Sequence, residues 1–140
     1  METRRKVLVV DDEDAIRMLV RKVLERSGFE VETARDGCEA IECLAAADYD
    51  VVLLDVMMPK LDGFGVVEEI QRTQPQLLAR TLLVTASHLK SLQSLPVRGI
   101  ITKPFSVSDL VDSVVECGAA PSGGVEGALM VATSTMAYEG

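Results

Sequence analysis

The chain has 140 residues, a mass of 15.1 kDa and 48% hydrophobic residues, which fits one folded domain and excludes a large multidomain enzyme. Lys and Arg number 14 against 22 Asp and Glu, so the net charge of −8 argues against direct binding of nucleic acid or an anionic membrane, which needs clustered cations. The apolar runs are too short to cross a bilayer or to form a signal-peptide core, and we expect a cytoplasmic protein without membrane contact.

Apolar runs of strand length alternate along the chain with segments of helical periodicity. Residues 6–10 predict a strand, and a helical pattern follows over 16–24 and stops at Gly28. The same alternation continues, with further strands expected at 31–34, 51–54, 81–84 and 99–102 and helices at 37–46, 63–73 and about 107–115. Ser106 or Ser108 is placed to cap the last helix. The three cysteines lack zinc-ligand or disulfide-framework spacing and are expected to be buried on helices: Cys38, Cys43 and Cys117.

Strands that alternate with helices, without hairpin turns, predict an α/β fold: a (βα)5 doubly wound, parallel five-stranded sheet. The predicted strands at 6–10, 51–54 and 81–84 are uninterrupted apolar runs, as expected where both faces of a strand are covered. The strand at 31–34 alternates and the one at 99–102 is short, so we expect these two at the edges. The resulting flavodoxin-like order, 2-1-3-4-5, places a ligand-binding switch point between the first and third strands, at their carboxyl ends.

Polar side chains follow four of the predicted strands at this edge: Asp11 and Asp12, Asp55, Thr85, and Lys103. Each one alone could be a helix cap or a solvated strand end. Together they should converge, and carboxylates about 5 Å apart repel by about 3 kcal/mol at an effective dielectric of 20, so the cluster needs a cation or must be partly protonated. A site with oxygen ligands, several bound waters and a shared phosphate is typical of Mg²⁺. Asp55 is then the candidate nucleophile that forms an aspartyl phosphate, with Lys103 and Thr85 on the phosphoryl oxygens.

The motifs around these residues resemble the receiver domain of bacterial two-component response regulators: VLVVDDE at 7–13, VVLLDVMMPKLDG at 51–63, LLVTAS at 82–87 and ITKPF at 101–105. The resemblance implies that Asp55 accepts a phosphoryl group from a sensor histidine kinase or a histidine phosphotransfer protein. It implies one magnesium site, held by Asp11, Asp12, Asp55 and the backbone carbonyl of Met57. It also implies that Lys103 pairs with the phosphoryl oxygens, that Thr85 moves onto them, and that a cis peptide bond joins Lys103 and Pro104.

Two features depart from the usual pattern of this family. Ile100 stands three residues before the lysine, where the family usually has an aromatic residue, and we expect its side chain to pack inward. The interval from Thr85 to Lys103 lacks about one helical turn, which predicts a shortened fourth helix within 87–93 and an atypical partner surface. The segment 118–140 has five glycines and no Lys or Arg, so we expect a receiver domain at 1–117 and a flexible Gly/Ala-rich C-terminal tail at 118–140.

We therefore predict a single-domain response regulator of a two-component phosphorelay, a monomer or a phosphorylation-dependent dimer, that changes its binding to a downstream protein target. A relay intermediate that passes the phosphoryl group to a histidine phosphotransfer protein is an alternative that the sequence does not separate from it. A hydrolase of the haloacid dehalogenase type is disfavoured, because its second Asp is replaced by Met57. A dinucleotide or flavin site lacks its GxGxxG motif. We predict a signalling domain and not an enzyme. The only reactions that this domain should catalyse are its own phosphorylation and its slow autodephosphorylation.

Overall fold

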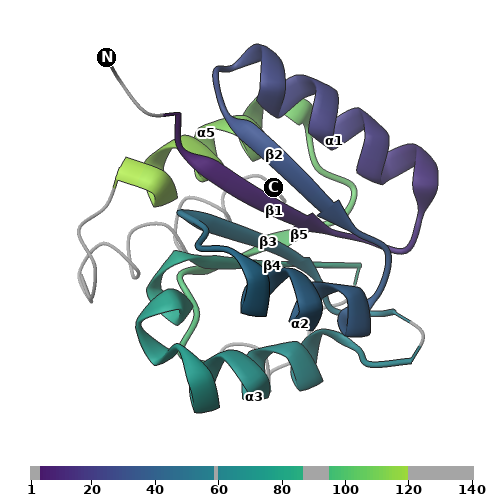
Figure 1. The fold of residues 1–140 in the computed structure, drawn as a ribbon. Helices are drawn as coiled ribbons and strands as arrows, with labels where there is room; N and C mark the ends of the chain where they lie inside the picture. The colour runs from purple at the N-terminus through teal and green to yellow at the C-terminus, as the bar shows by residue number, and fades with distance from the viewer. Residues whose placement is uncertain (1–3, 59, 87–94, 120–140) are drawn as a thin grey trace.

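One parallel sheet forms the centre of the molecule, and helices cover both of its faces (Figure 1). The computed structural model describes residues 4–58, 60–86 and 95–119. The strands are β1 (Lys6–Val10), β2 (Glu30–Ala34), β3 (Val51–Asp55), β4 (Thr81–Thr85) and β5 (Gly99–Thr102). All neighbouring strands pair in parallel, in the order β2-β1-β3-β4-β5. The predicted α/β fold and its strand order are therefore confirmed.

Besides the strands, the described residues form four α-helices and one 3₁₀ helix, and the last of them follows β5: α1 (Asp14–Arg26), α2 (Gly37–Ala46), α3 (Gly63–Thr73), η1 (Pro75–Arg80) and α5 (Val107–Ala119). Figure 1 shows α1 and α5 on one face of the sheet and α2 and α3 on the other. The sequence did not predict η1, and the last helix extends to Ala119, beyond its predicted end at about residue 115. The predicted short fourth helix within 87–93 and the tail beyond residue 119 lie outside the described residues.

Two apolar cores, one on each face of the sheet, explain the uninterrupted apolar runs of the central strands. Val7 and Val9 of β1 pack in the core beneath α1 and α5, whereas Leu8 and Val10 pack in the core beneath α2 and α3. All four side chains are at most 2% exposed, because successive residues of a strand point to opposite faces. In the edge strand β2, Val31 and Ala34 are buried, whereas Glu32 and Thr33 between them are partly exposed, so this strand is less completely covered than the central strands.

Short local signals set the ends of the helices that follow the strands. Gly28 adopts a φ of 98° directly after α1, which is the left-handed conformation that commonly ends a helix. Asp36 caps α2 by accepting a hydrogen bond from the amide of Glu39 at 2.8 Å. Ser106 accepts a hydrogen bond from the amide of Asp109 at 3.1 Å, so Ser106 rather than Ser108 caps α5. These caps begin each helix close to the carboxyl end of the preceding strand.

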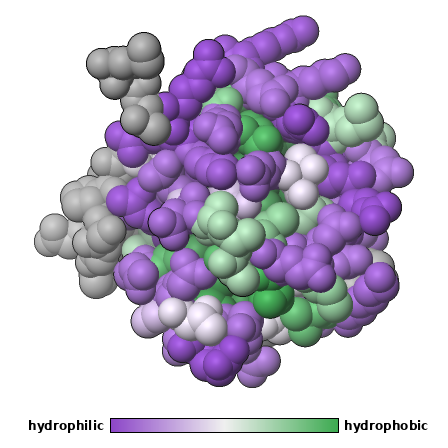
Figure 2. Space-filling model, viewed as in Figure 1, coloured by the Kyte–Doolittle hydropathy of each residue, from purple (hydrophilic) through white to green (hydrophobic). Residues whose placement is uncertain are grey.

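The surface of the face seen in Figure 1 is mostly hydrophilic, and apolar residues gather over α2 and between α2 and α3 (Figure 2). Ile41 of α2, Phe64 of α3 and Leu61 just before α3 are partly buried and pack against the core beneath these two helices. This core therefore extends to partly exposed apolar side chains of α2 and α3. No helix among the described residues is long and apolar enough to cross a membrane.

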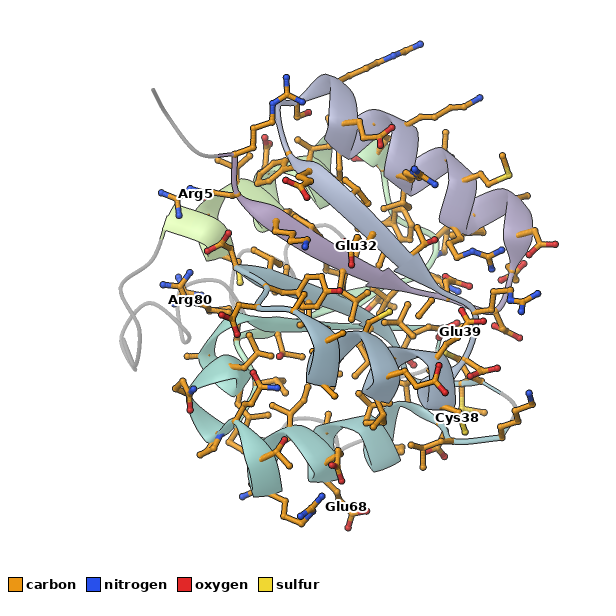
Figure 3. All side chains as sticks on the ribbon, in the orientation of Figure 1. Arg5, Glu32, Cys38, Glu39, Glu68 and Arg80 are labelled. Atoms are coloured by element: carbon orange, nitrogen blue, oxygen red, sulfur yellow. The ribbon has the colours of Figure 1, made fainter. Side chains whose placement is uncertain are left out.

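The side chain of Tyr49, just before β3, forms a hydrogen bond to the edge strand β2, and its contribution to stability can be measured. It is buried and donates a hydrogen bond at 2.5 Å to Oε1 of Glu32 on β2, whose other oxygen lies 3.1 Å from Nζ of Lys6 (Figure 3). Burial and this hydrogen bond raise the pKa of Tyr49. We expect Tyr49→Phe to lower the free energy of unfolding by about 1 kcal/mol in urea titrations. Glu32→Gln keeps an acceptor and should cost less; equal stability of Tyr49→Phe and wild type would contradict the prediction.

Candidate functional site

The carboxyl ends of the central strands bring the predicted site residues to one end of the sheet. Asp11 follows β1 directly, Asp55 ends β3 and Thr85 ends β4. The backbone amide of Lys103, just after β5, donates to the carbonyl oxygen of Thr85 at 2.7 Å, and the amide of Asp11 donates to Ala34 at 3.1 Å. The parallel register thus places all of these positions at the carboxyl ends of neighbouring strands, at one end of the sheet.

Three carboxylates form a cluster at this end of the sheet. One carboxylate oxygen from each of Asp11, Asp12 and Asp55 lies within 4.8 Å of the others. Asp11 and Asp55 are only 5% and 4% exposed, whereas Asp12 is exposed to solvent. This set of hard oxygen donors, buried on one side and open to water on the other, fits Mg²⁺, which binds to a few carboxylates and keeps several waters. A soft metal would prefer sulfur or imidazole ligands.

Lys103 lies between the carboxylates. Its Nζ is 3.6 Å from Oδ2 of Asp11, 3.6 Å from Oδ2 of Asp55 and 3.5 Å from Oε1 of Glu13. Burial works against the charged form of Lys103, but the negative charges of Asp11 and Asp55 outweigh it and raise its pKa. Glu13 is a neighbour of this ammonium group that the sequence analysis did not assign; its place in the acidic run after β1 was the available signal.

The ionised form of the Asp55 carboxyl group is disfavoured in this site. Its burial and the nearby charge of Asp11 raise its pKa to about 6, against the opposing effects of Lys103 and of the backbone N–H of Met57. That N–H donates to Oδ1 of Asp55 at 3.1 Å and so helps to orient the carboxylate. A cation bound among these oxygens would favour the ionised form of Asp55.

The loop after Asp55 packs so closely that two glycines are required. A Cβ on Gly63 would lie 2.7 Å from Cα of Val56 and 2.8 Å from the carbonyl oxygen of Asp55, and a Cβ on Gly37 would lie 2.0 Å from the carbonyl oxygen of Leu61. Both obstacles are backbone atoms, so a side chain at either position would displace the loop that follows the candidate nucleophile. The packing of this loop against the first turn of α2 thus helps to fix Asp55.

The remaining predictions around the site have mixed outcomes. The cis peptide bond between Lys103 and Pro104 is present. Ile100 is partly buried and packs against the core beneath α2 and α3, which confirms its inward packing. The prediction that the cysteines are buried is wrong for Cys38, which is exposed in the first turn of α2, and right for Cys117 (Figure 3).

The sequence model of the response regulator receiver domain matches residues 7–115 of this chain. The chain belongs to this family. It is 41% identical over 112 residues to a probable transcriptional regulator, ycf27, of Guillardia theta, and 41% identical over 106 residues to the alkaline phosphatase synthesis transcriptional regulatory protein PhoP of Bacillus subtilis. The matches cover 79% and 73% of this chain but only 44% and 43% of those proteins, so the receiver chain spans less than half the length of these relatives.

Solved receiver structures share its fold across most of their length. The chemotaxis response regulator CheY4 of Vibrio cholerae is 33% identical, with a TM-score of 0.74 over 82% of this chain and 99% of that one. The response regulator TrrA of Thermotoga maritima, solved in complex with Mg²⁺ and BeF, is 35% identical, with a TM-score of 0.73 over 81% of this chain and 98% of that one. The predicted receiver family is confirmed, and with it a phosphoryl-accepting role in two-component signalling.

Proposed function

We propose that Asp55 of this receiver domain accepts a phosphoryl group from the phosphohistidine of a sensor histidine kinase or phosphotransfer protein, and that the modified domain binds a protein target differently. The observation that supports this assignment is the position of Asp55: its buried carboxylate lies 3.6 Å from Nζ of Lys103 and clusters with the carboxylates of Asp11 and Asp12. The longer relatives are named as transcriptional regulators, and the proposal does not extend their regulation of transcription to this chain.

In the proposed reaction an ionised oxygen of Asp55 attacks phosphorus, and the bond between phosphorus and the imidazole nitrogen of the donor breaks. The nitrogen keeps the bonding electrons and takes up a proton, so the products are an aspartyl phosphate and a neutral histidine. In this reaction the Lys103 ammonium group and the Thr85 hydroxyl would stabilise the phosphoryl oxygens. Mg²⁺, held by Asp11, Asp12, Asp55 and the carbonyl of Met57, would add positive charge beside these oxygens.

The side chain of Met57 supports a signalling role for the phosphorylated state. It is 64% exposed and stands two residues after Asp55, where it offers neither an acid nor a base to activate a water molecule. The acyl phosphate should therefore hydrolyse slowly, as a signal that another protein reads requires. Enzymatic turnover of a phosphate ester at this site would need a proton-transferring group that Met57 does not supply.

Intact-protein mass spectrometry after incubation with acetyl phosphate tests this proposal. We expect the wild type to gain one phosphoryl group with Mg²⁺ present and little without it, and Asp55→Asn to gain none. Asp50→Asn is the matched control, because Asp50 precedes the same strand at the opposite end of the sheet, and this variant should be phosphorylated like the wild type. Modification of Asp55→Asn to the wild-type extent would show that another residue is the acceptor. A wild type that stays unmodified by both acetyl phosphate and a phosphohistidine protein would refute the proposal.

A further inference from the structure

We propose that Arg17 is a positioning residue of the magnesium site, because it fixes the turn between β1 and α1 that carries Asp11 and Asp12. This inference rests on the proposed function and adds a residue of α1 that is not itself a ligand. Figure 1 shows α1 beginning beside the end of β1, so a side chain in the first turns of this helix can reach back to the strand end.

The guanidinium group of Arg17 bridges the turn with two hydrogen bonds. Nη1 donates to the carbonyl oxygen of Asp11 at 2.9 Å, and Nη2 donates to Oδ1 of Asp14 at 2.5 Å. The side chain of Arg17 is only 11% exposed, in contrast to 79% for that of Asp14, so Arg17 lies against the protein rather than in solvent. A planar group that holds two acceptors in fixed directions makes the turn more rigid than a single contact could.

Arg17 completes the set of bonds that hold Asp11. The amide of Asp11 donates to Ala34 at 3.1 Å, and its Oδ1 accepts from the amide of Glu13 at 2.9 Å. Arg17 holds the carbonyl oxygen, and Oδ2 is left as the carboxylate oxygen that lies 3.6 Å from Nζ of Lys103. Loss of the Arg17 contact would release the one backbone group of Asp11 that depends on a side chain.

The same contact also directs Asp12. The carbonyl group of Asp11 belongs to the peptide plane that joins Asp11 to Asp12, so a hydrogen bond to this oxygen restricts the rotation of that plane. Asp12 is exposed, and the backbone that carries it sets the position from which its side chain extends. Groups that orient metal ligands commonly change metal affinity by about ten- to a hundredfold when they are removed.

The sign of the effect separates positioning from simple electrostatics. A positive charge near a cation site opposes the binding of Mg²⁺, so removal of that charge alone should make the binding tighter. Removal of a positioning contact should make it weaker. Arg17→Gln removes both the charge and the two-pronged contact, whereas Arg17→Lys keeps the charge and cannot hold both acceptors in the same plane.

The test measures Mg²⁺ affinity by calorimetric titration of the wild type and of these two variants. We expect Mg²⁺ to bind about tenfold more weakly to Arg17→Gln, and to Arg17→Lys with an affinity between those of Arg17→Gln and the wild type. Arg21→Gln is the matched control: Arg21 lies one turn further along α1, is half exposed and pairs with Glu25 at 3.3 Å. This variant should bind Mg²⁺ as tightly as the wild type or slightly more tightly. Asp12→Ala should abolish binding and shows that the titration reports on this site.

Thermal unfolding without Mg²⁺ is measured in parallel, so that a general loss of structure is recognised. Weaker Mg²⁺ binding by a folded Arg17→Gln or Arg17→Lys supports the inference; if Arg17→Gln does not fold, Arg17→Lys alone decides. Unchanged or tighter binding by the folded variants, with a wild type that binds Mg²⁺, overturns the role of Arg17 and leaves the proposed function intact. A wild type without Mg²⁺ affinity overturns the magnesium site itself and the role of Arg17 with it.

Discussion

Asp55→Asn is expected to stabilise the protein in the absence of Mg²⁺ by about 3 kcal/mol at pH 7.5. The folded protein raises the pKa of Asp55 from its ordinary value of 3.8 to about 6, through burial and the charge of Asp11. Each unit of pKa corresponds to about 1.4 kcal/mol, so the ionised carboxylate opposes folding by about 3 kcal/mol. Asparagine keeps the shape and an acceptor for the Met57 amide but carries no charge. In a domain of this size the melting temperature should rise by roughly 10 °C.

The pH dependence of this effect has a definite sign. A carboxyl group with a raised pKa in the folded state binds its proton more tightly there than in the unfolded chain. The stability of the wild type should therefore fall as the pH rises from about 4 to above 6, as far as Asp55 contributes to it. The advantage of Asp55→Asn should be complete above pH 7 and should nearly vanish at pH 4, where the wild-type carboxyl is protonated. Urea titrations in EDTA at several pH values measure this difference.

Asp50→Asn provides the matched control for Asp55→Asn. Asp50 accepts a hydrogen bond from the amide of Lys6 at 2.8 Å and lies 3.9 Å from Nη1 of Arg80. Figure 3 shows Arg80 and Arg5 at the end of the sheet where the strands begin, so Asp50 has a more cationic environment than Asp55. The same substitution should therefore bring no stabilisation there. Addition of Mg²⁺ should raise the melting temperature of the wild type more than that of Asp55→Asn. If Asp55→Asn were less stable than the wild type in EDTA, this result would contradict the raised pKa of Asp55.

The fold could be predicted from the sequence because the pattern of apolar and polar residues along each strand reflects which of its faces are buried. The runs that contain Leu8, Leu53 and Leu83 are apolar throughout, since each strand must fill a core on both faces. The alternation in β2 marked it as an edge strand, and the order of the remaining strands followed. The short turn η1 was missed, because Pro75 and the two buried leucines after it give too short a pattern to distinguish a 3₁₀ turn from a loop.

The site was predictable to the extent that strand ends define it. Asp11, Asp55 and Lys103 directly adjoin strands, so the topology alone brings them together. Glu13 and Arg17 belong to the same site through the directions of their side chains, which depend on how α1 sits on the sheet. Spacing along the sequence does not specify those directions, and an Arg on a helix next to an acidic run has many possible partners. Residues that orient a site are therefore harder to predict than residues that compose it.

Lys103→Gln is expected to change stability and Mg²⁺ affinity in opposite directions. The Lys103 ammonium group lies 3.5–3.6 Å from Asp11, Asp55 and Glu13, and its side chain is only 20% exposed. Its removal leaves two nearly buried carboxylates without this cation, and we expect the Mg²⁺-free protein to lose about 2 kcal/mol of stability, since one side of the site stays open to water.

The same substitution should make Mg²⁺ binding about tenfold tighter. The ammonium group and the metal ion neutralise the same oxygens, and repulsion between them opposes the binding of the metal. A repulsion of about 1.4 kcal/mol corresponds to tenfold in affinity, and a divalent and a monovalent cation about 6 Å apart reach this value even at the dielectric constant of water. Phosphorylation by acetyl phosphate should nevertheless fall, because no positive side chain then pairs with the phosphoryl oxygens.

Two further variants show whether the charge of Lys103 is responsible. Lys103→Arg keeps a cation and should retain wild-type stability without Mg²⁺ more closely than Lys103→Gln does. Lys60→Gln removes a lysine charge from the loop after Asp55; Lys60 is 69% exposed and pairs with Asp36 at 3.5 Å, so this variant should change Mg²⁺ affinity little. If Mg²⁺ bound more weakly to Lys103→Gln than to the wild type, Lys103 would be holding the carboxylates in place for the metal. In that case the geometry that Lys103 imposes on Asp11 and Asp55 outweighs the repulsion between the two cations.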